Sequence, residues 1–305
     1  LDNKGDKVET ANATTRLISS DNVVAILGAL TSTNTAQTIA IADKKGIPVI
    51  APVATNDQLT AKRTFANRVC FTDSFQGEVV ANYAKAQAYK TAVVVVDQSQ
   101  VYSLGLAKAF ETAFKKNGGE IVKTIKITSG DKDFKAVVSQ IKETNPDFMF
   151  LPLYHPEASM IARQSKQLGL EKPMFSGDGV ANQTFIDLGG DAVNGYMFTD
   201  FFDYTNPPSQ KSADFVAYHE KETGKAEMNS FTALGADTYN ILIDAMNRCE
   251  DPTNSVCINE QIKKTTDFDG VSGKITINKE GNATRSAVIK EVKDGKAVFK
   301  ATVNP

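Results

Sequence analysis

The run Ala92-Val93-Val94-Val95-Val96 decides the fold class of this chain. It is apolar throughout and rich in β-branched residues, which is typical of a parallel strand buried on both faces. A helical pattern follows at 104–117, where apolar residues recur three and four positions apart until Gly118-Gly119 ends the helix. A second apolar run comes next at 121–127. This order of strand, helix and strand predicts a parallel sheet covered by helices.

The same alternation continues on both sides of this run. Further strands are predicted at 23–27, 47–50, 148–153 and 174–176, and further helices at 8–19, 33–45, 134–144 and 157–168. After a predicted turn at 267–270, short strands joined by turn sequences are predicted at 274–278, 287–292 and 297–303. The 305 residues are enough for two domains, and 41% apolar residues give each of them a core. We therefore expect an α/β protein with two doubly wound parallel-sheet lobes and an antiparallel finish.

The beginning of the chain departs from this pattern. A doubly wound lobe starts with a strand, whereas this chain starts with a turn and then a helix at 8–19. From the usual length of βαβ units, we expect a strand, a helix and another strand, about 40 residues in all, to precede Leu1. Residues 1–6 carry neither the basic and apolar segments of a secretion signal nor a lipobox cysteine. Either a leader has been removed or the chain starts inside a domain.

Charge and hydropathy exclude several classes of partner. The 34 Lys and Arg residues nearly balance the 36 Asp and Glu residues, which gives a formal net charge of −2. A protein that binds nucleic acid without sequence preference needs a basic surface, and so does one held to anionic lipid by charge alone. The longest apolar runs are far shorter than the ~20 residues that cross a bilayer. We expect no nucleic-acid partner and no membrane span.

The motifs of the common enzyme and metal-site classes are absent. No G-x-G-x-x-G follows a strand, and neither a phosphate-binding P-loop nor a G-x-S-x-G nucleophile elbow occurs. The only two histidines, His155 and His219, lie outside any metal-binding or triad pattern. We expect no catalytic residues, no metal and no cofactor.

The three cysteines are too few for a disulfide scaffold. Cys249 and Cys257 bracket a polar loop that contains Pro252, so a local bridge is sterically feasible, and so are two reduced thiols. A bridge would require an oxidising compartment. Cys70 lies at the end of an apolar run and is predicted to be a buried thiol.

Hydroxyl side chains gather where two predicted strands end. Thr31, Ser32, Thr33 and Thr35 open the helix that follows 23–27, and Thr55 follows the strand at 47–50. Open α/β sheets bind ligands at the carboxyl ends of their strands. A single Ser or Thr is enough to cap a helix, so capping is one interpretation of the cluster. The other is a seat for a carboxylate, formed by hydroxyls and the free N–H groups at the positive end of a helix.

Six segments, in order along nearly the whole chain, resemble the type I periplasmic solute-binding proteins of ABC transporters, and most closely their leucine/isoleucine/valine-binding branch. They are Leu27-Gly-Ala-Leu-Thr-Ser-Thr-Asn-Thr35, Ile50-Ala-Pro-Val-Ala-Thr55, Asp97-Gln-Ser-Gln-Val-Tyr-Ser-Leu-Gly105, Gly130-Asp-Lys-Asp-Phe134, Tyr154-His-Pro-Glu157 and Ser176-Gly-Asp-Gly-Val-Ala-Asn182. In this family a strand, a first pocket loop and a helix precede the point where this chain starts, which agrees with the segment expected before Leu1.

The resemblance implies a set of ligand-binding residues. It places Ser32, Thr55 and the backbone N–H of Val53 or its neighbour on a ligand carboxylate. It places Asp178 on a ligand ammonium, and it has Tyr102 and Tyr154 close over the ligand from the second lobe. Such partners are needed because a zwitterion buried without them costs several kcal/mol. As ordinary structural residues, Asp178 would instead occupy a turn and the tyrosines would be half-buried aromatics.

One position departs from the family pattern. Several relatives have an aromatic residue in the helix that begins near Phe231. The equivalent position here is Leu234, or Phe231 in a shifted alignment, so the pattern leaves open which residue forms the subpocket for the ligand side chain and therefore which amino acid binds.

The resemblance also implies the domain boundaries. Three crossings give a first lobe of 1–72 with 201–276, incomplete at its N-terminus, and a second lobe of 73–200 with 277–305. Polar stretches at 71–75 and 204–210 are candidate crossings.

The function implied is that of an extracytoplasmic receptor of an ABC importer, without catalytic activity. It would bind a branched-chain or other small aliphatic amino acid between its lobes, close by hinge motion and deliver the ligand to the membrane permease. It would be periplasmic or at the cell surface, with or without a lipid anchor. Two alternatives stay open. One is a ligand-sensing regulatory receptor of the same fold, and the other is a nucleotide-dependent Rossmann-like enzyme, which the missing glycine fingerprint disfavours.

Overall fold

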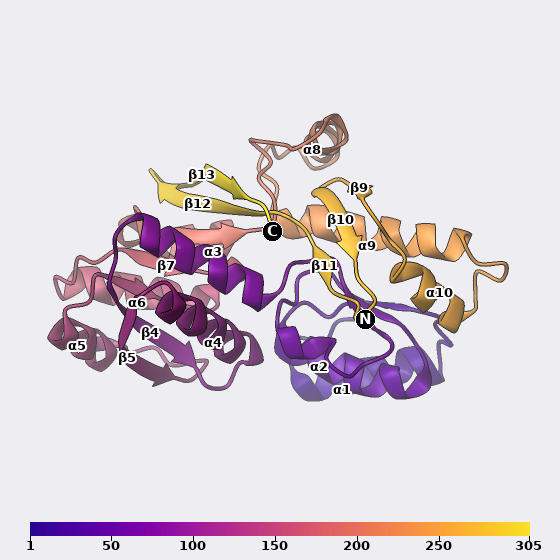
Figure 1. Ribbon diagram of the computed structural model, residues 1–305, viewed down its shortest axis with the longest axis horizontal. Coiled ribbons are helices and arrows are strands. Elements are labelled where there is room, and N and C mark those ends of the chain that lie inside the picture. Colours follow the sequence, from indigo (N-terminus) through magenta and orange to yellow (C-terminus); the bar gives the residue numbers. More distant parts are fainter. The chain divides into compact units, whose positions relative to one another are not determined.

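A computed structural model describes residues 1–305 of the chain. Its contacts divide the chain into two compact units. The first unit contains Leu1–Thr72, Asn206–Ser286 and Pro305, and the second contains Asp73–Thr205 and Ala287–Asn304. Figure 1 colours both units by sequence and labels their elements.

Helices and strands alternate along most of the chain. The helices are α1 (Lys7–Ser19), α2 (Ser32–Ala42), α3 (Asp73–Ala86), α4 (Val101–Lys116), α5 (Lys135–Thr144), α6 (His155–Gln167), α7 (Gln183–Gly189), α8 (Gln210–Thr223), α9 (Ser230–Asn247) and α10 (Ser255–Ile262), with 3₁₀ turns η1 (Asp43–Lys45), η2 (Asp57–Leu59), η3 (Asp178–Val180) and η4 (Gly190–Val193). The strands are β1 (Ile26–Leu27), β2 (Val49–Ala51), β3 (Ala66–Arg68), β4 (Thr91–Asp97), β5 (Glu120–Ile127), β6 (Phe148–Phe150), β7 (Met174–Ser176), β8 (Met197–Asp200), β9 (Phe268–Gly270), β10 (Gly273–Ile277), β11 (Ala283–Thr284), β12 (Ala287–Lys293) and β13 (Lys296–Val303).

The first unit contains a short parallel sheet in the order β1-β2-β3. Ile26 pairs with Val49, and Val49 pairs with Ala66. The core beside this sheet includes Ile39 of α2 together with strand residues that are almost fully buried. Because side chains from α2 and the sheet share this core, the helix start and the strand ends are fixed relative to each other.

The first unit also holds an antiparallel sheet in the order β11-β10-β9. The sequence interpretation of 267–270 as a turn is wrong, because Phe268–Gly270 forms strand β9 and pairs with β10. Asp237 of α9 fixes the turn between these strands by accepting hydrogen bonds from the N–H groups of Val271 (2.6 Å) and Ser272 (2.9 Å).

The second unit is built on a seven-stranded sheet in the order β13-β12-β8-β7-β6-β4-β5. Its five strands from β4 to β8 are parallel, as the sequence predicts for β4, β5, β6 and β7 but not for β8, which it does not predict. The last two strands turn back on this sheet: β12 pairs antiparallel with β8 and β13 pairs antiparallel with β12. The parallel arrangement brings the carboxyl ends of β4, β6 and β7 to one edge of the sheet.

In the second unit, the packing of helix α3 on helix α4 depends on a glycine in α3. Helix α3 packs on α4, and a Cβ atom added at Gly77 would lie only 2.6 Å from the backbone nitrogen of Phe110. Helix α6 packs against α5 and α7. The close approach of α3 to α4 therefore requires glycine at position 77.

The compact units and the lobes predicted from the sequence differ at two crossings. Residues 201–205 stay with the second unit, where Asp203 contacts Lys290, whereas the prediction places them in the first lobe. Residues 277–286 stay with the first unit because β11 pairs with β10, whereas the prediction places them in the second lobe. That the two units act as hinged lobes stays a prediction.

Two of the three cysteines form a disulfide and the third is a free thiol. Cys249, just after α9, and Cys257, in the first turn of α10, are joined by a disulfide with a Cα–Cα distance of 6.0 Å. Cys70 is a buried thiol outside any disulfide. No helix of the structure combines the length and the apolar character needed to cross a membrane.

Candidate functional site

The start of α2 carries Ser32 in the first unit. Thr31 caps the helix, because its Oγ1 accepts a hydrogen bond from the N–H of Asn34 (3.4 Å). The hydroxyl of Ser32 is buried and is not used as the cap. It accepts a hydrogen bond from the N–H of Asn56 (3.3 Å), so its own proton can still be donated. This bond ties the helix start to the loop that follows β2.

That loop holds the two other residues predicted in the first unit. Val53 and Thr55 are buried, and Thr55 is only 1% exposed. The Oγ1 of Thr55 is buried without a hydrogen-bond partner, which is costly for a hydroxyl group. A buried hydroxyl of this kind can donate to an anion that comes within hydrogen-bond distance.

Arg68 fixes the shape of this loop. Its guanidinium donates to the carbonyl oxygens of Ala54 (3.1 Å) and Asn56 (2.8 Å). These two carbonyls flank Thr55, so the charged side chain holds the loop on both sides of that hydroxyl. Arg68 is fully buried at the end of β3. Hydroxyl donors, the start of a helix and a nearby buried cation together suit a carboxylate.

In the second unit, the structure brings Tyr102, Tyr154 and Asp178 together at the carboxyl ends of β4, β6 and β7. The rings of Tyr102 and Tyr154 are stacked, with centroids 5.0 Å apart. The hydroxyl oxygen of Tyr102 accepts a hydrogen bond from the N–H of Gly179 (3.1 Å), the residue after Asp178. Tyr102 is buried and Tyr154 is half-buried. Tyr102 thus lies beside the carboxyl group of Asp178, and Tyr154 stacks on Tyr102.

The loop before α4 positions Tyr102. The carboxyl of Asp97 accepts hydrogen bonds from the N–H (2.8 Å) and the hydroxyl (2.6 Å) of Ser99. The N–H of Asp97 donates to the hydroxyl of Ser103 (2.8 Å). These bonds turn the chain directly from the end of β4 into α4, so that Tyr102 lies in the first turn of that helix.

Asp178 is the buried acid of this cluster, with an exposed fraction of 5%. Burial raises its pKa to about 7, the charge of Asp200 acts in the same direction, and a hydrogen bond from Gln76 opposes the rise. The pKa of Tyr102 is also raised, by burial and by the neighbouring charge of Asp178. A buried carboxylate beside aromatic rings is a suitable partner for an organic cation such as an ammonium group.

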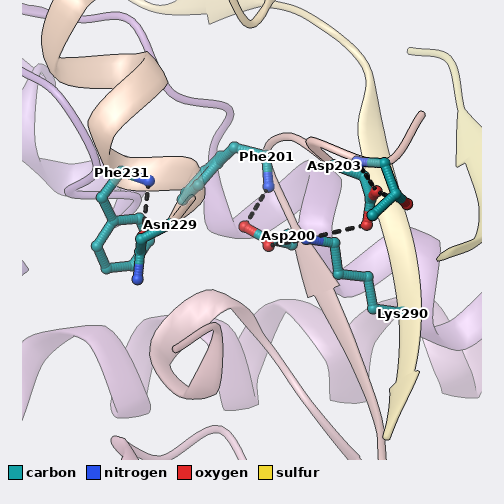
Figure 2. A network of polar contacts seen from close by, with 7 residues as sticks. Asp200, Phe201, Asp203, Asn229, Phe231 and Lys290 are labelled. Atoms are coloured by element: carbon teal, nitrogen blue, oxygen red, sulfur yellow. Dashed lines mark hydrogen bonds and ion pairs between the residues drawn. The ribbon is translucent and has the colours of Figure 1, made fainter. Parts of the chain in front are cut away.

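A buried ion-pair network lies beyond Asp178 in the same unit. The ammonium of Lys290 contacts Asp200 (2.8 Å) and Asp203 (3.2 Å), as Figure 2 shows. Burial alone lowers the pKa of Lys290, but the charges of the two carboxylates outweigh burial and raise it. The network anchors the segment after β8 to strand β12.

The residues considered for the ligand side-chain subpocket lie at the start of α9 in the first unit. Asn229 caps this helix by accepting a hydrogen bond from the N–H of Phe231 (2.8 Å), drawn in Figure 2. Phe231 is half-buried, whereas Leu234 is fully buried.

The profile of the periplasmic binding protein family matches residues 1–297. The chain belongs to the periplasmic binding protein family. The type I fold predicted from the sequence is likewise confirmed by solved structures. The leucine-binding protein LivK of Thermotoga maritima is 37% identical to this chain with a TM-score of 0.97, and the match covers 100% of this chain and 87% of that one.

Two further relatives of this periplasmic binding protein carry related descriptions. The branched-chain amino acid transporter substrate-binding protein LivJ of Streptococcus pneumoniae, solved in complex with isoleucine, is 31% identical with a TM-score of 0.91, over 100% of this chain and 86% of that one. The Leu/Ile/Val/Thr-binding protein of Salmonella typhimurium is 29% identical over 293 residues, which cover 92% of this chain and 78% of the relative.

Proposed function

We propose that this periplasmic binding protein binds a branched-chain or other small aliphatic amino acid and delivers it to the membrane permease of an ABC importer. The observation that carries the proposal is that each unit has a seat for a charged group and that the two seats have opposite preferences. The first unit offers donors to a carboxylate at Ser32, Val53 and Thr55, and the second offers Asp178 to an ammonium. An α-amino acid has both groups. The relatives LivK and LivJ of this protein are described as leucine and branched-chain amino acid binding proteins, and they support the same ligand class.

The seats also favour binding over catalysis. Each proposed contact neutralises or solvates a charge of the ligand, and none combines a nucleophile with a base. We therefore propose a receptor without enzymatic activity. The disulfide Cys249–Cys257 supports a location outside the cytoplasm, because such bonds persist in oxidising compartments. We propose a periplasmic or cell-surface location. Mass spectrometry of the N-terminus of the mature native protein tests for a lipid anchor.

A thermal-shift panel tests the ligand class. The panel contains the twenty amino acids, related small acids, sugars and nucleotides. A ligand at about 100 times its Kd stabilises the folded protein by about 2.7 kcal/mol, which raises the melting temperature measurably. We expect leucine, isoleucine or valine to give the largest shifts. A response only to sugars or nucleotides would refute the amino-acid assignment, and a cofactor-like response to nucleotides would favour the enzyme alternative.

The pKa of Asp178 predicts how affinity depends on pH. Only the ionised carboxylate attracts an ammonium, and in the free protein Asp178 gains its charge as the pH rises through about 7. Affinity should therefore rise up to about tenfold per unit from about pH 5 to about pH 7 and level off above that. The groups of the ligand itself keep their charges in this range. Calorimetric titration across this range measures the effect, and the Asp178→Asn variant should show a flat profile.

A further inference from the structure

Gln76 is a fully buried polar side chain in the first turn of α3, and nothing in the sequence singled it out. We propose that Gln76 is the positioning residue for Asp178: it holds the carboxyl group in the orientation that receives a ligand ammonium. This inference rests on the proposed function and deepens it, because it identifies what gives the ammonium seat its geometry.

Both ends of the Gln76 amide are engaged with the same neighbour. Its Nε2 donates to Oδ1 of Asp178 (2.8 Å), and its Oε1 accepts from the backbone N–H of Asp178 (2.7 Å). The same Oε1 accepts from the hydroxyl of Thr199 on β8 (2.5 Å). One amide thus links the main chain and the side chain of Asp178, which restricts the rotation of that side chain. Thr199 in turn fixes the amide.

The surrounding backbone is shaped to admit this amide. A Cβ atom added at Gly177 would clash with the Oε1 of Gln76 and would lie 2.5 Å from both the hydroxyl of Tyr102 and a methyl of Leu106. The glycine before Asp178 therefore leaves the space that Gln76 and Tyr102 occupy. Gly77, directly after Gln76, allows the close approach of α3 to α4. Gly177 thus provides the space for the Gln76 side chain, and Gly77 allows the helix that carries it to pack closely on α4.

A neutral donor suits the chemistry of the seat. Besides Gln76, the side chains that act electrostatically on Asp178 are Asp200 at the end of β8 and Tyr102 of α4, and Asp73 of α3 acts on Tyr102. None of these is a cation. Lysine or arginine at position 76 would pair with Asp178 and compete with a ligand ammonium, whereas the amide stabilises the carboxylate without neutralising it.

The isosteric variant Gln76→Met tests the proposal through two ligands. One is leucine, and the other is 4-methylpentanoate, which has the same shape but no amino group, measured by competition. Loss of a hydrogen bond to a buried charged group should weaken leucine binding by about 10- to 100-fold. Binding of 4-methylpentanoate should change by less than about threefold, because it does not use Asp178. Should Gln76→Met fail to fold, Gln76→Asn, which is one methylene too short to span the contact, takes its place.

The variant Gln76→Glu serves as the conservative rescue. Two carboxyl groups this close share one proton, and the shared proton takes the place of the amide donor. The other oxygen of the new carboxyl group can still accept from Thr199 and from the N–H of Asp178. At about pH 6, Gln76→Glu should bind leucine within about threefold of the wild type.

Tyr196→Phe is the matched control. It removes a buried hydrogen bond to Ser176 (2.6 Å) in the same unit without contacting Gln76, so it should leave the preference for leucine over 4-methylpentanoate unchanged. The proposal is overturned if Gln76→Met weakens both ligands equally, or if Gln76→Glu is as weak as Gln76→Met. If the wild-type protein binds no amino acid at all, the proposed function fails instead, which separates the two results.

Discussion

The Asp178→Ala variant is expected to bind the amino acid about 30- to 3,000-fold more weakly than the wild type while keeping its fold. Removing the carboxylate leaves the ligand ammonium desolvated and unpaired, and truncations of this kind cost roughly 2–5 kcal/mol. At 1.4 kcal/mol per tenfold change in Kd, that cost corresponds to the stated range. Calorimetric titration at about pH 8, where Asp178 is ionised, measures the largest difference.

Ser32→Ala provides the comparison for this result. Ser32 is one neutral donor among several at the proposed carboxylate seat, so its loss should cost only about 0.5–1.5 kcal/mol. The order of the two effects is the informative outcome. If Asp178→Ala binds as tightly as the wild type, the ammonium seat lies elsewhere and the assignment of the pocket residues falls with it.

Asp178 strengthens ligand binding, but its buried carboxyl group lowers the stability of the ligand-free protein. In the folded protein the pKa of Asp178 lies near 7, whereas in the unfolded chain it lies near 3.8. Between these values the folded state holds more protons than the unfolded state, so this group makes the free energy of unfolding fall as the pH rises from about 4 to about 7. Asp178 is thus retained at a cost to the ligand-free fold, as expected of a residue that serves binding.

The sequence predicts the wholly apolar strands well, but it leaves the 14-residue helices α3 and α8 unpredicted. Strand β4 and the helix after it are evident because five apolar residues in a row match a strand buried on both faces. Strands β3 and β8 were not predicted, because polar residues interrupt them. Asn67 in β3 and Thr199 in β8 are both buried. The side chain of Asn67 is hydrogen-bonded to Asn259 (3.0 Å), and that of Thr199 is hydrogen-bonded to Gln76. A hydropathy pattern does not show that a distant side chain will satisfy a polar group.

The residues of the candidate site are also predicted only in part from the sequence. Tyr102, Tyr154 and Asp178 follow three strands of one parallel sheet, so the rule that strand ends share an edge, together with the family resemblance, already places them together. Gln76 lies in a helix after a crossing, and its contact with Asp178 joins residues 102 positions apart. The only local signal was a polar residue that, with Asp73, lies among the apolar buried residues of α3.

The Lys290→Met variant is expected to lose about 3–5 kcal/mol of stability. Lys290 is 5% exposed and is the cation shared by Asp200 and Asp203, both of which are buried as well. Removing the cation takes away the counter-charge that the two buried carboxylates share, and this penalty exceeds the gain from the apolar replacement. Chemical denaturation at neutral pH measures the loss.

Lys300→Met is the matched control for this prediction. Its ammonium also lies 2.8 Å from a carboxylate, that of Glu291, but the Lys300 side chain is 46% exposed. Water screens such a pair, so its loss should cost far less stability than the loss of the buried Lys290 ammonium. Equal losses in the two variants would show that the buried network contributes no more than a surface pair, and that the segment after β8 is anchored by its apolar contacts instead.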